Sequence, residues 1–206
     1  MNKNHLTLCS FGDQNKTSYK MNNVDDFIQW TEENFTYVPY NPRKNINRFG
    51  LSITSLDGGV TGIPDLDSLR EYNYEHNTSY EEQDFTEFTS VSLHKSLKEI
   101  LDPIKDNIFR THILKLGPGG FFPPHRDFRK AEIDSCRLII PLKNVNPPGV
   151  NFVIEDKICH WDKGRVYFVN TAKLHYIFNG TLENSYWIVI NCKLDDNLTN
   201  LIISSF

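Results

Sequence analysis

The residue pair with the clearest chemical potential is His125 and Asp127, a His-x-Asp motif that follows a turn rich in Gly and Pro. On a β-strand, residues i and i+2 point to the same face, so this imidazole and this carboxylate lie side by side. They can supply two of the three ligands of a 2-His-1-carboxylate iron site. The third ligand is expected from a histidine on a later strand, and His175 fits.

Whether this pair indicates a metal site depends on the sequence around it. Alone, a His-x-Asp motif is weak evidence, because a lone histidine on a strand more often has a structural role. His175, however, lies on a different predicted strand, much later in the chain than Asp127. Roughly three predicted strands separate the two, which returns the chain to the same end of a jelly roll.

The second half of the chain has the pattern of an all-β core. Short segments rich in β-branched and aromatic residues are separated by Gly, Pro and Asn. Many short strands at regular spacing are typical of a sandwich, jelly roll or barrel. The predicted strands are 108–116, 121–128, 136–143, 150–155, 165–170, 174–179 and 185–193.

The first half is expected to form an α-rich flank packed on this core, within a single domain of 206 residues. The predicted helices cover Val24–Asn34 with Asn23 as N-cap, Leu66–Asn73 capped by Asp65, and Ser90 or Ser92 to Leu101. We predict a strand over 48–56, an edge strand or arm within 1–22, and a covering loop over 74–88.

This division gives a mainly β protein with an α flank. Residues 1–107 form the flank that shapes the substrate pocket, 108–194 form the core, and 195–206 form a C-terminal tail. In the flank, Arg48 is the first residue of the predicted strand 48–56 and is a candidate to recognise a substrate carboxylate.

Composition excludes several classes of function. The net charge is -4 and no basic field is present, which argues against nucleic-acid binding. No apolar run is long enough for a signal peptide or a membrane span, so a membrane association is not expected. The scattered cysteines form no C-x-x-C motif and are interpreted as reduced thiols of a cytoplasmic protein: Cys9, Cys136, Cys159 and Cys192.

The order of several stretches resembles the aspartyl/asparaginyl β-hydroxylase family. These stretches are Ile113–Asp127, Arg137–Leu142, Gly164–Asn170 and His175–Asn179. The resemblance implies a double-stranded β-helix and a dioxygenase that uses Fe(II), 2-oxoglutarate and O2 and releases succinate. The implied substrate is an amino acid or an amino-acid residue in a peptide or protein, hydroxylated at an aliphatic carbon.

The resemblance also assigns roles to residues. By position, His125, Asp127 and His175 are the iron ligands and the catalytic centre, and Arg137 helps to hold 2-oxoglutarate. In related halogenases a small residue replaces the carboxylate ligand, so the presence of Asp127 favours hydroxylation. Residues 137, 139 and 141 alternate onto one face, which allows Arg137 to point into the barrel.

One position departs from the family pattern. The family places an Arg about ten residues after the distal histidine to bind the far carboxylate of 2-oxoglutarate, where a planar guanidinium makes two parallel hydrogen bonds. This chain has Ser185 there. The candidates for a substitute cation are Lys115, Arg137, Arg165 and Lys193.

The same departure is also consistent with a different mode of 2-oxoglutarate binding, or with a loss of turnover in which only metal binding remains. We favour a substitute cation because all three ligands are present. The alternative functions are a non-catalytic jelly-roll module that binds a metal or ligand, and a cupin-like metal enzyme that does not use 2-oxoglutarate.

Overall fold

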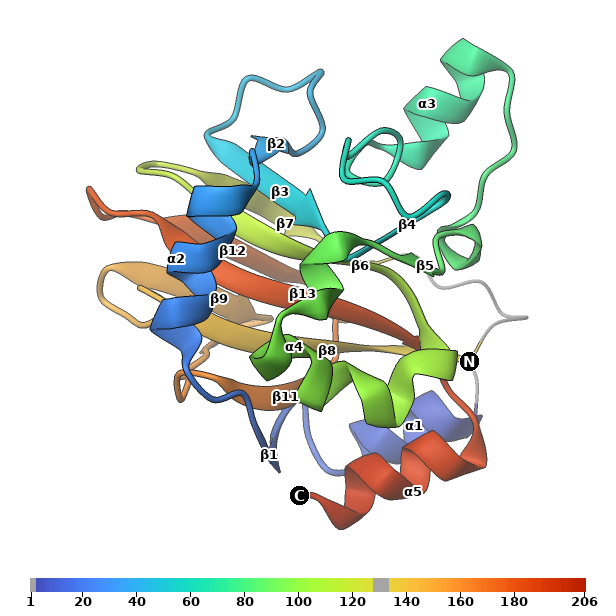
Figure 1. Cartoon of the computed structure of the whole chain (residues 1–206). Helices are drawn as coiled ribbons and strands as arrows, with labels where there is room; N and C mark the ends of the chain where they lie inside the picture. Colours follow the sequence, from blue (N-terminus) through green and yellow to red (C-terminus); the bar gives the residue numbers. More distant parts are fainter. Residues whose placement is uncertain (1–2, 128–133) are drawn as a thin grey trace.

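The computed structural model describes residues 3–127 and 134–206, and it contains two facing antiparallel β-sheets with helices over one of them (Figure 1). The larger sheet has the strand order β1-β11-β8-β13-β6-β3-β2, and the smaller has the order β10-β9-β12-β7. A third, two-stranded sheet pairs β4 with β5.

The strands of the core agree closely with the predicted ones. They are β6 (Ile108–Leu116), β7 (Phe121–His125), β8 (Ser135–Lys143), β9 (Val150–Ile154), β10 (Lys157–Ile158), β11 (Arg165–Val169), β12 (His175–Asn179) and β13 (Ser185–Lys193). The short strand β10 was not predicted. Phe128, the last residue of the predicted strand 121–128, lies outside the described residues.

The path of the chain through these strands defines the architecture. From β6 onward, the strands β6, β8, β11 and β13 lie in the larger sheet, and β7, β9, β10 and β12 lie in the smaller one. The chain thus crosses between two facing antiparallel sheets as it proceeds, which is the topology of a jelly roll. The structure confirms the predicted double-stranded β-helix.

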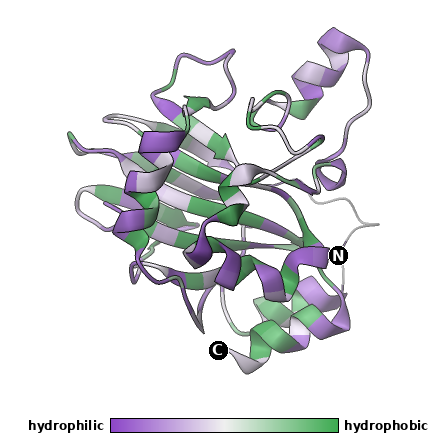
Figure 2. Cartoon of the chain, viewed as in Figure 1, coloured by the Kyte–Doolittle hydropathy of each residue, from purple (hydrophilic) through white to green (hydrophobic). Residues whose placement is uncertain are grey.

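Strand alternation gives the molecule two hydrophobic clusters. On β8, Ile139 faces the inner cluster between the sheets, whereas Leu138 and Ile140 belong to the outer cluster beneath the helices. The hydropathy colouring shows the resulting alternation along the strands of the larger sheet (Figure 2). Because the central strands β8 and β13 of the larger sheet are buried on both faces, most of their residues are apolar.

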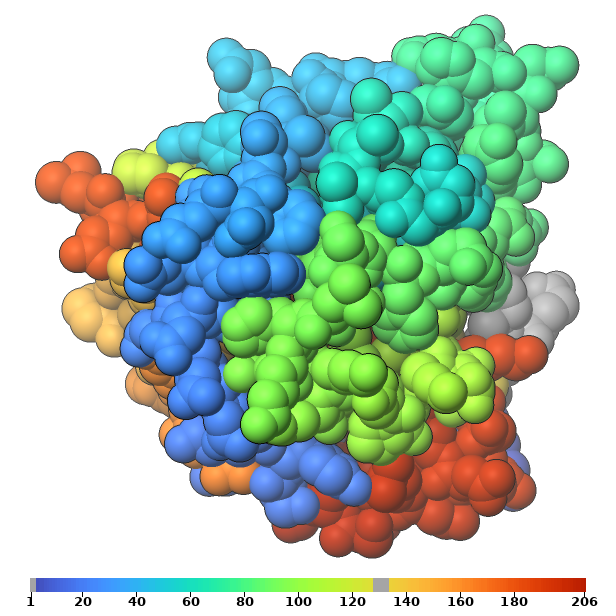
Figure 3. Space-filling view, viewed as in Figure 1, coloured from blue at the N-terminus to red at the C-terminus, as the bar shows by residue number. Residues whose placement is uncertain are grey.

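The helical elements cover the outer face of the larger sheet, as the space-filling view shows for α2 and α4 (Figure 3). They are α1 (Lys3–Cys9), α2 (Val24–Asn34), α3 (Leu69–His76), α4 (Lys95–Leu101), α5 (Asp196–Ser204) and the 3-10 helices η1 (Glu82–Asp84), η2 (Ser90–Leu93) and η3 (Asp102–Asn107). Of these, α3 and η1 stand beside the sheet near β4 and β5 rather than over its centre (Figure 1).

The flank was predicted less accurately than the core. The helix Val24–Asn34 is confirmed, but Asn23 makes no side-chain capping bond and its backbone is left-handed. The predicted helix Leu66–Asn73 begins later, at Leu69, and its N-cap is Ser68 rather than Asp65. The predicted tail contains the helix α5, and α1 was not predicted at all.

Five flank strands contribute to the sheets: β1 (Gln14–Lys20), β2 (Val38–Pro39), β3 (Arg48–Ser52), β4 (Thr54–Ser55) and its partner β5 (Glu87–Phe88). Of these, β3 matters most for the site, because it pairs with β6 and extends the larger sheet of the barrel. The predicted strand 48–56 is therefore found as β3 and β4, interrupted at Ile53. Among the described residues, no helix is both long and apolar enough to cross a membrane.

The turn between β6 and β7 fixes where β7 begins. The backbone N–H of Gly117 donates to the carbonyl of Asn47, 2.9 Å away. A Cβ on Gly120 would clash with the carbonyl oxygen of Asn47, so only glycine fits at this approach. The flank therefore packs directly against the turn that leads into the His-x-Asp strand.

Candidate metal centre

The two histidines of the predicted triad come together through strand pairing. His125 at the end of β7 and His175 at the start of β12 are register partners in the smaller sheet. Asp127 follows β7, and its backbone N–H donates to the carbonyl of Thr171, 2.9 Å away, which turns the chain back toward β12. Sequence-distant residues thus meet at one end of the barrel.

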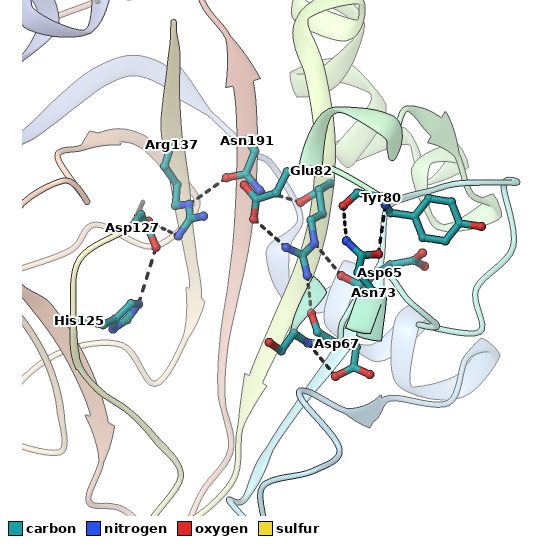
Figure 4. A network of polar contacts seen from close by, with 11 residues as sticks. Asp65, Asp67, Asn73, Tyr80, Glu82, His125, Asp127, Arg137 and Asn191 are labelled. Atoms are coloured by element: carbon teal, nitrogen blue, oxygen red, sulfur yellow. Dashed lines mark hydrogen bonds and ion pairs between the residues drawn. The ribbon is translucent and has the colours of Figure 1, made fainter. Parts of the chain in front are cut away.

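The geometry suits a single ion. One ligand atom from each of His125, Asp127 and His175 can be chosen so that all three lie within 4.8 Å of one another. The Nε2 of His125 is 3.8 Å from Oδ1 of Asp127 (Figure 4). The rings of the two histidines have centroids 4.2 Å apart. Two imidazoles and one carboxylate on a common face match the donor set of a non-haem iron site.

Hydrogen bonds on the far side of each ring fix the tautomers. Nδ1 of His125 lies 2.7 Å from the carbonyl oxygen of Pro123, and Nδ1 of His175 lies 3.0 Å from that of Lys173. A carbonyl oxygen only accepts, so each Nδ1 carries the proton and each Nε2 keeps a free lone pair. This is the arrangement that orients histidine ligands in metal sites, and the residues present therefore fit a metal ion.

The carboxylate is held by a half-buried arginine. Arg137 on β8 places Nη1 2.5 Å from Oδ2 of Asp127, and its Nε donates to Oδ1 of Asn191 at 2.9 Å. Burial acts to raise the pKa of Asp127, but the charge of Arg137, together with a hydrogen bond from Thr171, outweighs it and holds this pKa below its usual value. Burial lowers the pKa of His175, which favours the neutral imidazole that a metal requires.

A cavity of about 150 Å³ lies beside the triad, between the two sheets. Its polar wall includes Arg137, His112 and Glu82, whereas its other walls are largely apolar. The apolar lining consists of Leu114, Phe122, Ile139, Phe152, Ile177 and Val189. Arg137 and Ile139 both face this cavity, as their alternation on the strand predicted.

The opposite end of the barrel interior is filled with side chains. Ser185, at the position where the family pattern has an Arg, is completely buried, and its Oγ accepts from Nε1 of Trp187 at 2.7 Å. Trp187 packs against Phe152 and Trp161. Ser185 is thus used by Trp187 and does not line the cavity, so its assignment as a residue that binds 2-oxoglutarate is not supported.

Three of the cations predicted to bind 2-oxoglutarate lie away from the cavity, which corrects that prediction. Lys115 faces the outer side of the larger sheet, where its Nζ is 2.9 Å from Oε1 of Glu32 and lies over the ring of Tyr37. Arg165 donates to the carbonyl of Ser18 at 2.6 Å. Lys193 is exposed at the end of β13, opposite Ser135. Strand alternation excludes Lys115 because its neighbour Leu114 occupies the inner face.

Two further residues of the site were not predicted. Asn191 lies on β13 two residues after Val189, and it connects Arg137 to β6 through a 2.7 Å bond from Nδ2 to the carbonyl of Arg110. The sequence did offer a signal for Asn191, because it is an amide residue within the mainly apolar segment that forms β13. Glu82 reaches the cavity from η1, within the stretch predicted only as a covering loop.

A larger cleft of about 700 Å³ opens next to the triad and shares Tyr40, Glu82, Asp127 and Arg137 with the inner cavity. Its outer wall is formed by α3 and η1. Arg110 secures this wall: its Nη1 lies 2.7 Å from Oε1 of Glu82, and its Nε donates to the carbonyl of Asp65 at 3.0 Å (Figure 4). Arg110 also has φ of 34°, a strained value for a non-glycine residue in a strand.

The fold and the three convergent ligands define a cupin-type double-stranded β-helix with a candidate metal centre, an architecture of metal-dependent enzymes and binding modules. The family model described as aspartyl/asparaginyl beta-hydroxylase matches residues 70–193, which is more than half of the chain. The protein therefore belongs to the aspartyl/asparaginyl β-hydroxylase family. A comparison with curated protein sequences gave no significant match.

Solved structures resemble the chain only distantly. A predicted oxalate decarboxylase from Thermotoga maritima is 16% identical with a TM-score of 0.34, and the match covers 46% of this chain and 74% of that one. A cupin domain from Bordetella pertussis is 14% identical (TM-score 0.33; 43% and 83% covered). A salicylate 1,2-dioxygenase from Pseudaminobacter salicylatoxidans is 19% identical (TM-score 0.33; 42% and 22% covered). Similarity at this level indicates nothing about the chemistry of this chain.

Proposed function

We propose that the protein is an Fe(II)- and 2-oxoglutarate-dependent dioxygenase that hydroxylates an aliphatic carbon of an amino acid, or of an amino-acid residue in a peptide, and releases succinate and CO2. The observation that carries this proposal is the triad of His125, Asp127 and His175 with both Nε2 atoms free. Three protein ligands on one face leave positions for a 2-oxo acid and for O2. Membership of the hydroxylase family supports it further.

The geometry of the site indicates which roles the metal ion would have and which roles the protein residues have. When bound, iron supplies the activation of O2 coupled to oxidation of 2-oxoglutarate. Arg137 keeps Asp127 ionised and oriented, and Asn191 keeps Arg137 in place. The apolar walls of the cavity, including Phe122 and Ile177, exclude water from the reacting groups.

The larger cleft supports an amino-acid or peptide substrate. It borders Asp127 and Arg137 and is lined by acidic, basic and amide side chains, among them Glu82, Arg70 and Asn73. A substrate with both an ammonium and a carboxylate group finds complementary charges in such a cleft. Because the cleft and the inner cavity meet at the triad, the substrate and 2-oxoglutarate reach the metal from different sides.

The first test is an anaerobic visible spectrum of the Fe(II)-loaded protein with and without 2-oxoglutarate. Chelation of the oxo acid gives a weak metal-to-ligand charge-transfer band, which we expect to appear. A screen of amino acids for succinate formation follows. Iron binding without this band, together with no succinate from any substrate, contradicts the proposal.

The second candidate is a metal-binding cupin-like module or enzyme that does not use 2-oxoglutarate. The filled end of the barrel favours it, because Ser185 and Trp187 occupy the region where the family has its carboxylate-binding Arg. The same spectrum separates the two candidates, since this alternative predicts iron binding and no response to 2-oxoglutarate.

A further inference from the structure

Arg48 on β3 is a buried cation without an anionic partner among residues 3–127 and 134–206. Only 3% of its surface is exposed. Its hydrogen bonds go to two backbone carbonyls at long distances, from Nε to Tyr40 at 3.3 Å and from Nη1 to Phe121 at 3.4 Å. Burial of a charge is costly unless an anion or strong hydrogen bonds compensate it. Such a guanidinium indicates a place for an anion.

The position of Arg48 relates it directly to the departure at Ser185. Ser185 and Leu116 are register partners between β13 and β6, and Leu116 and Arg48 are register partners between β6 and β3. Register partners point to the same face of a sheet. The three residues therefore form one row across the inner face, and adjacent strands lie about 4.8 Å apart, which puts Arg48 roughly 10 Å from Ser185.

The cations predicted for this role are already paired or placed elsewhere. Arg137 binds Asp127 and Asn191, and Lys115 binds Glu32 on the outer face. Arg165 bonds to β1. Arg48 differs from these three because it faces the barrel interior and makes only the two long carbonyl contacts and contacts with aromatic rings.

Two rings separate Arg48 from the cavity, and both belong to the cavity wall. The guanidinium carbon lies 4.2 Å from the ring centroid of Phe122 and 5.7 Å from that of Tyr40. The Phe122 ring is in turn 6.1 Å from that of His125. Phe122 is only half-buried, so other side chains do not enclose its ring completely.

We propose that Arg48 binds the far carboxylate of 2-oxoglutarate, in place of the arginine that the family pattern has at the position of Ser185. The oxo acid extends from the metal along the inner face of β6, and the ring of Phe122 moves aside. A bidentate guanidinium–carboxylate pair replaces the two long carbonyl contacts. This inference rests on the proposed function, because it requires that a 2-oxo acid binds at the metal.

The test compares 2-oxoglutarate with 2-oxopentanoate, which has the same chain length but a methyl group in place of the far carboxylate. Affinities are measured by anaerobic calorimetry on the Fe(II)-loaded wild type and on Arg48→Met, which keeps the side-chain length. We expect the wild type to prefer 2-oxoglutarate by about 30-fold or more, the loss usual when one partner of a buried charge pair is removed. Arg48→Met should abolish this preference and leave 2-oxopentanoate binding unchanged.

Lys115→Met is the matched control, because it removes a largely buried cation of β6, the neighbour of β3, on the outer face of the same sheet. It should retain the full preference. A second measurement needs no variant: the Arg48 guanidinium resonance of the Zn(II)-loaded wild type should shift on addition of 2-oxoglutarate and not on addition of 2-oxopentanoate.

The outcomes separate this inference from the function on which it rests. An unchanged preference in Arg48→Met, or equal affinity of the wild type for both acids, overturns the role of Arg48 and leaves 2-oxo acid binding intact. Failure of the Fe(II)-loaded wild type to bind either acid overturns both. If Arg48→Met does not fold, the resonance of the wild type decides.

Discussion

The two ends of the barrel interior differ in what occupies them. At the metal end, His125, Asp127, His175 and Arg137 form a polar, hydrogen-bonded group beside a cavity and a cleft. At the filled end, Ser185 is completely buried and Trp187 is almost completely buried. Trp187 belongs to the apolar inner cluster. Both ends are built on the same strands, so the difference lies in side chains and not in the fold.

This contrast indicates which parts of the proposed oxygenase site are separable. The candidate metal ligands are one residue each of β7 and β12 and Asp127, which follows β7, and β8 and β13 support the carboxylate. Recognition of the far carboxylate needs a cation elsewhere in the barrel, and its place can change without disturbing the ligands. The filled end of this chain is consistent with such a relocation toward the flank strand β3.

The largest effect is expected from removing the carboxylate ligand. Asp127→Ala should weaken Fe(II) binding by more than the roughly 10–100-fold that loss of a supporting partner costs. The affinity is measured by anaerobic calorimetry. His160→Ala, an exposed histidine outside the triad, is the control and should bind as the wild type does. Tight Fe(II) binding by Asp127→Ala would show that the metal end is not the metal site.

Removing the support of the carboxylate should destabilise the metal-free protein. Arg137→Met leaves the Asp127 carboxylate without its 2.5 Å partner, and breaking a buried ion pair on one side costs about 3–5 kcal/mol of unfolding free energy. The measurement is urea denaturation without metal and then with a divalent ion, which should restore part of the loss by supplying positive charge. Arg126→Met, in an exposed pair with Glu155, should change stability by less than about 1 kcal/mol. Equal losses in both variants would contradict a supporting role for Arg137.

His112 lies between the two ends and should give the metal-free protein a pH-dependent stability. Burial, with the charges of Arg110 and Arg137, lowers the pKa of His112 to about 3. The unfolded chain, with a pKa near 6.5, therefore binds the proton first as the pH falls, and stability declines from about pH 6.5 downward. His112→Gln should remove up to about 1.4 kcal/mol per pH unit from this slope in denaturation at several pH values.

The smallest effect is expected at the filled end. Ser185→Ala leaves the buried Nε1 of Trp187 without its acceptor and should cost about 1–3 kcal/mol of unfolding free energy. Fe(II) affinity should not change, because Ser185 does not line the cavity. Ser204→Ala, at an exposed helix end, is the stability control. A loss of Fe(II) affinity in Ser185→Ala would show that the two ends are not independent.

The sequence predicted the barrel well because its signals are local. The i, i+2 spacing of His125 and Asp127 and the alternation of Arg137 with Leu138 follow from strand geometry, and the structure shows both. The candidate Lys115 was not examined with that same alternation, which places Leu114 inside and Lys115 outside.

The flank could not be predicted to the same degree, because its geometry depends on distant contacts. Asp65 resembles a helix cap in sequence, yet the carbonyl of Asp65 is bound by Arg110 from β6, and the helix starts later. Glu82 reaches the cavity only because its 3-10 helix is held by the same arginine. No local pattern encodes such a pairing between a loop and a strand.

The strand β7 lies at the edge of the smaller sheet and is paired only with β12 among the described strands. It contains Pro123 and Pro124, which have no N–H to donate, and most of its residues are exposed or half-buried. An ion bound by His125 and His175 would cross-link this edge strand to its neighbour, so part of the binding free energy would become local folding free energy. In the metal-free protein β7 should therefore be the first strand to unfold locally. The concentration of available metal would then set the fraction of molecules in which β7 is detached from β12.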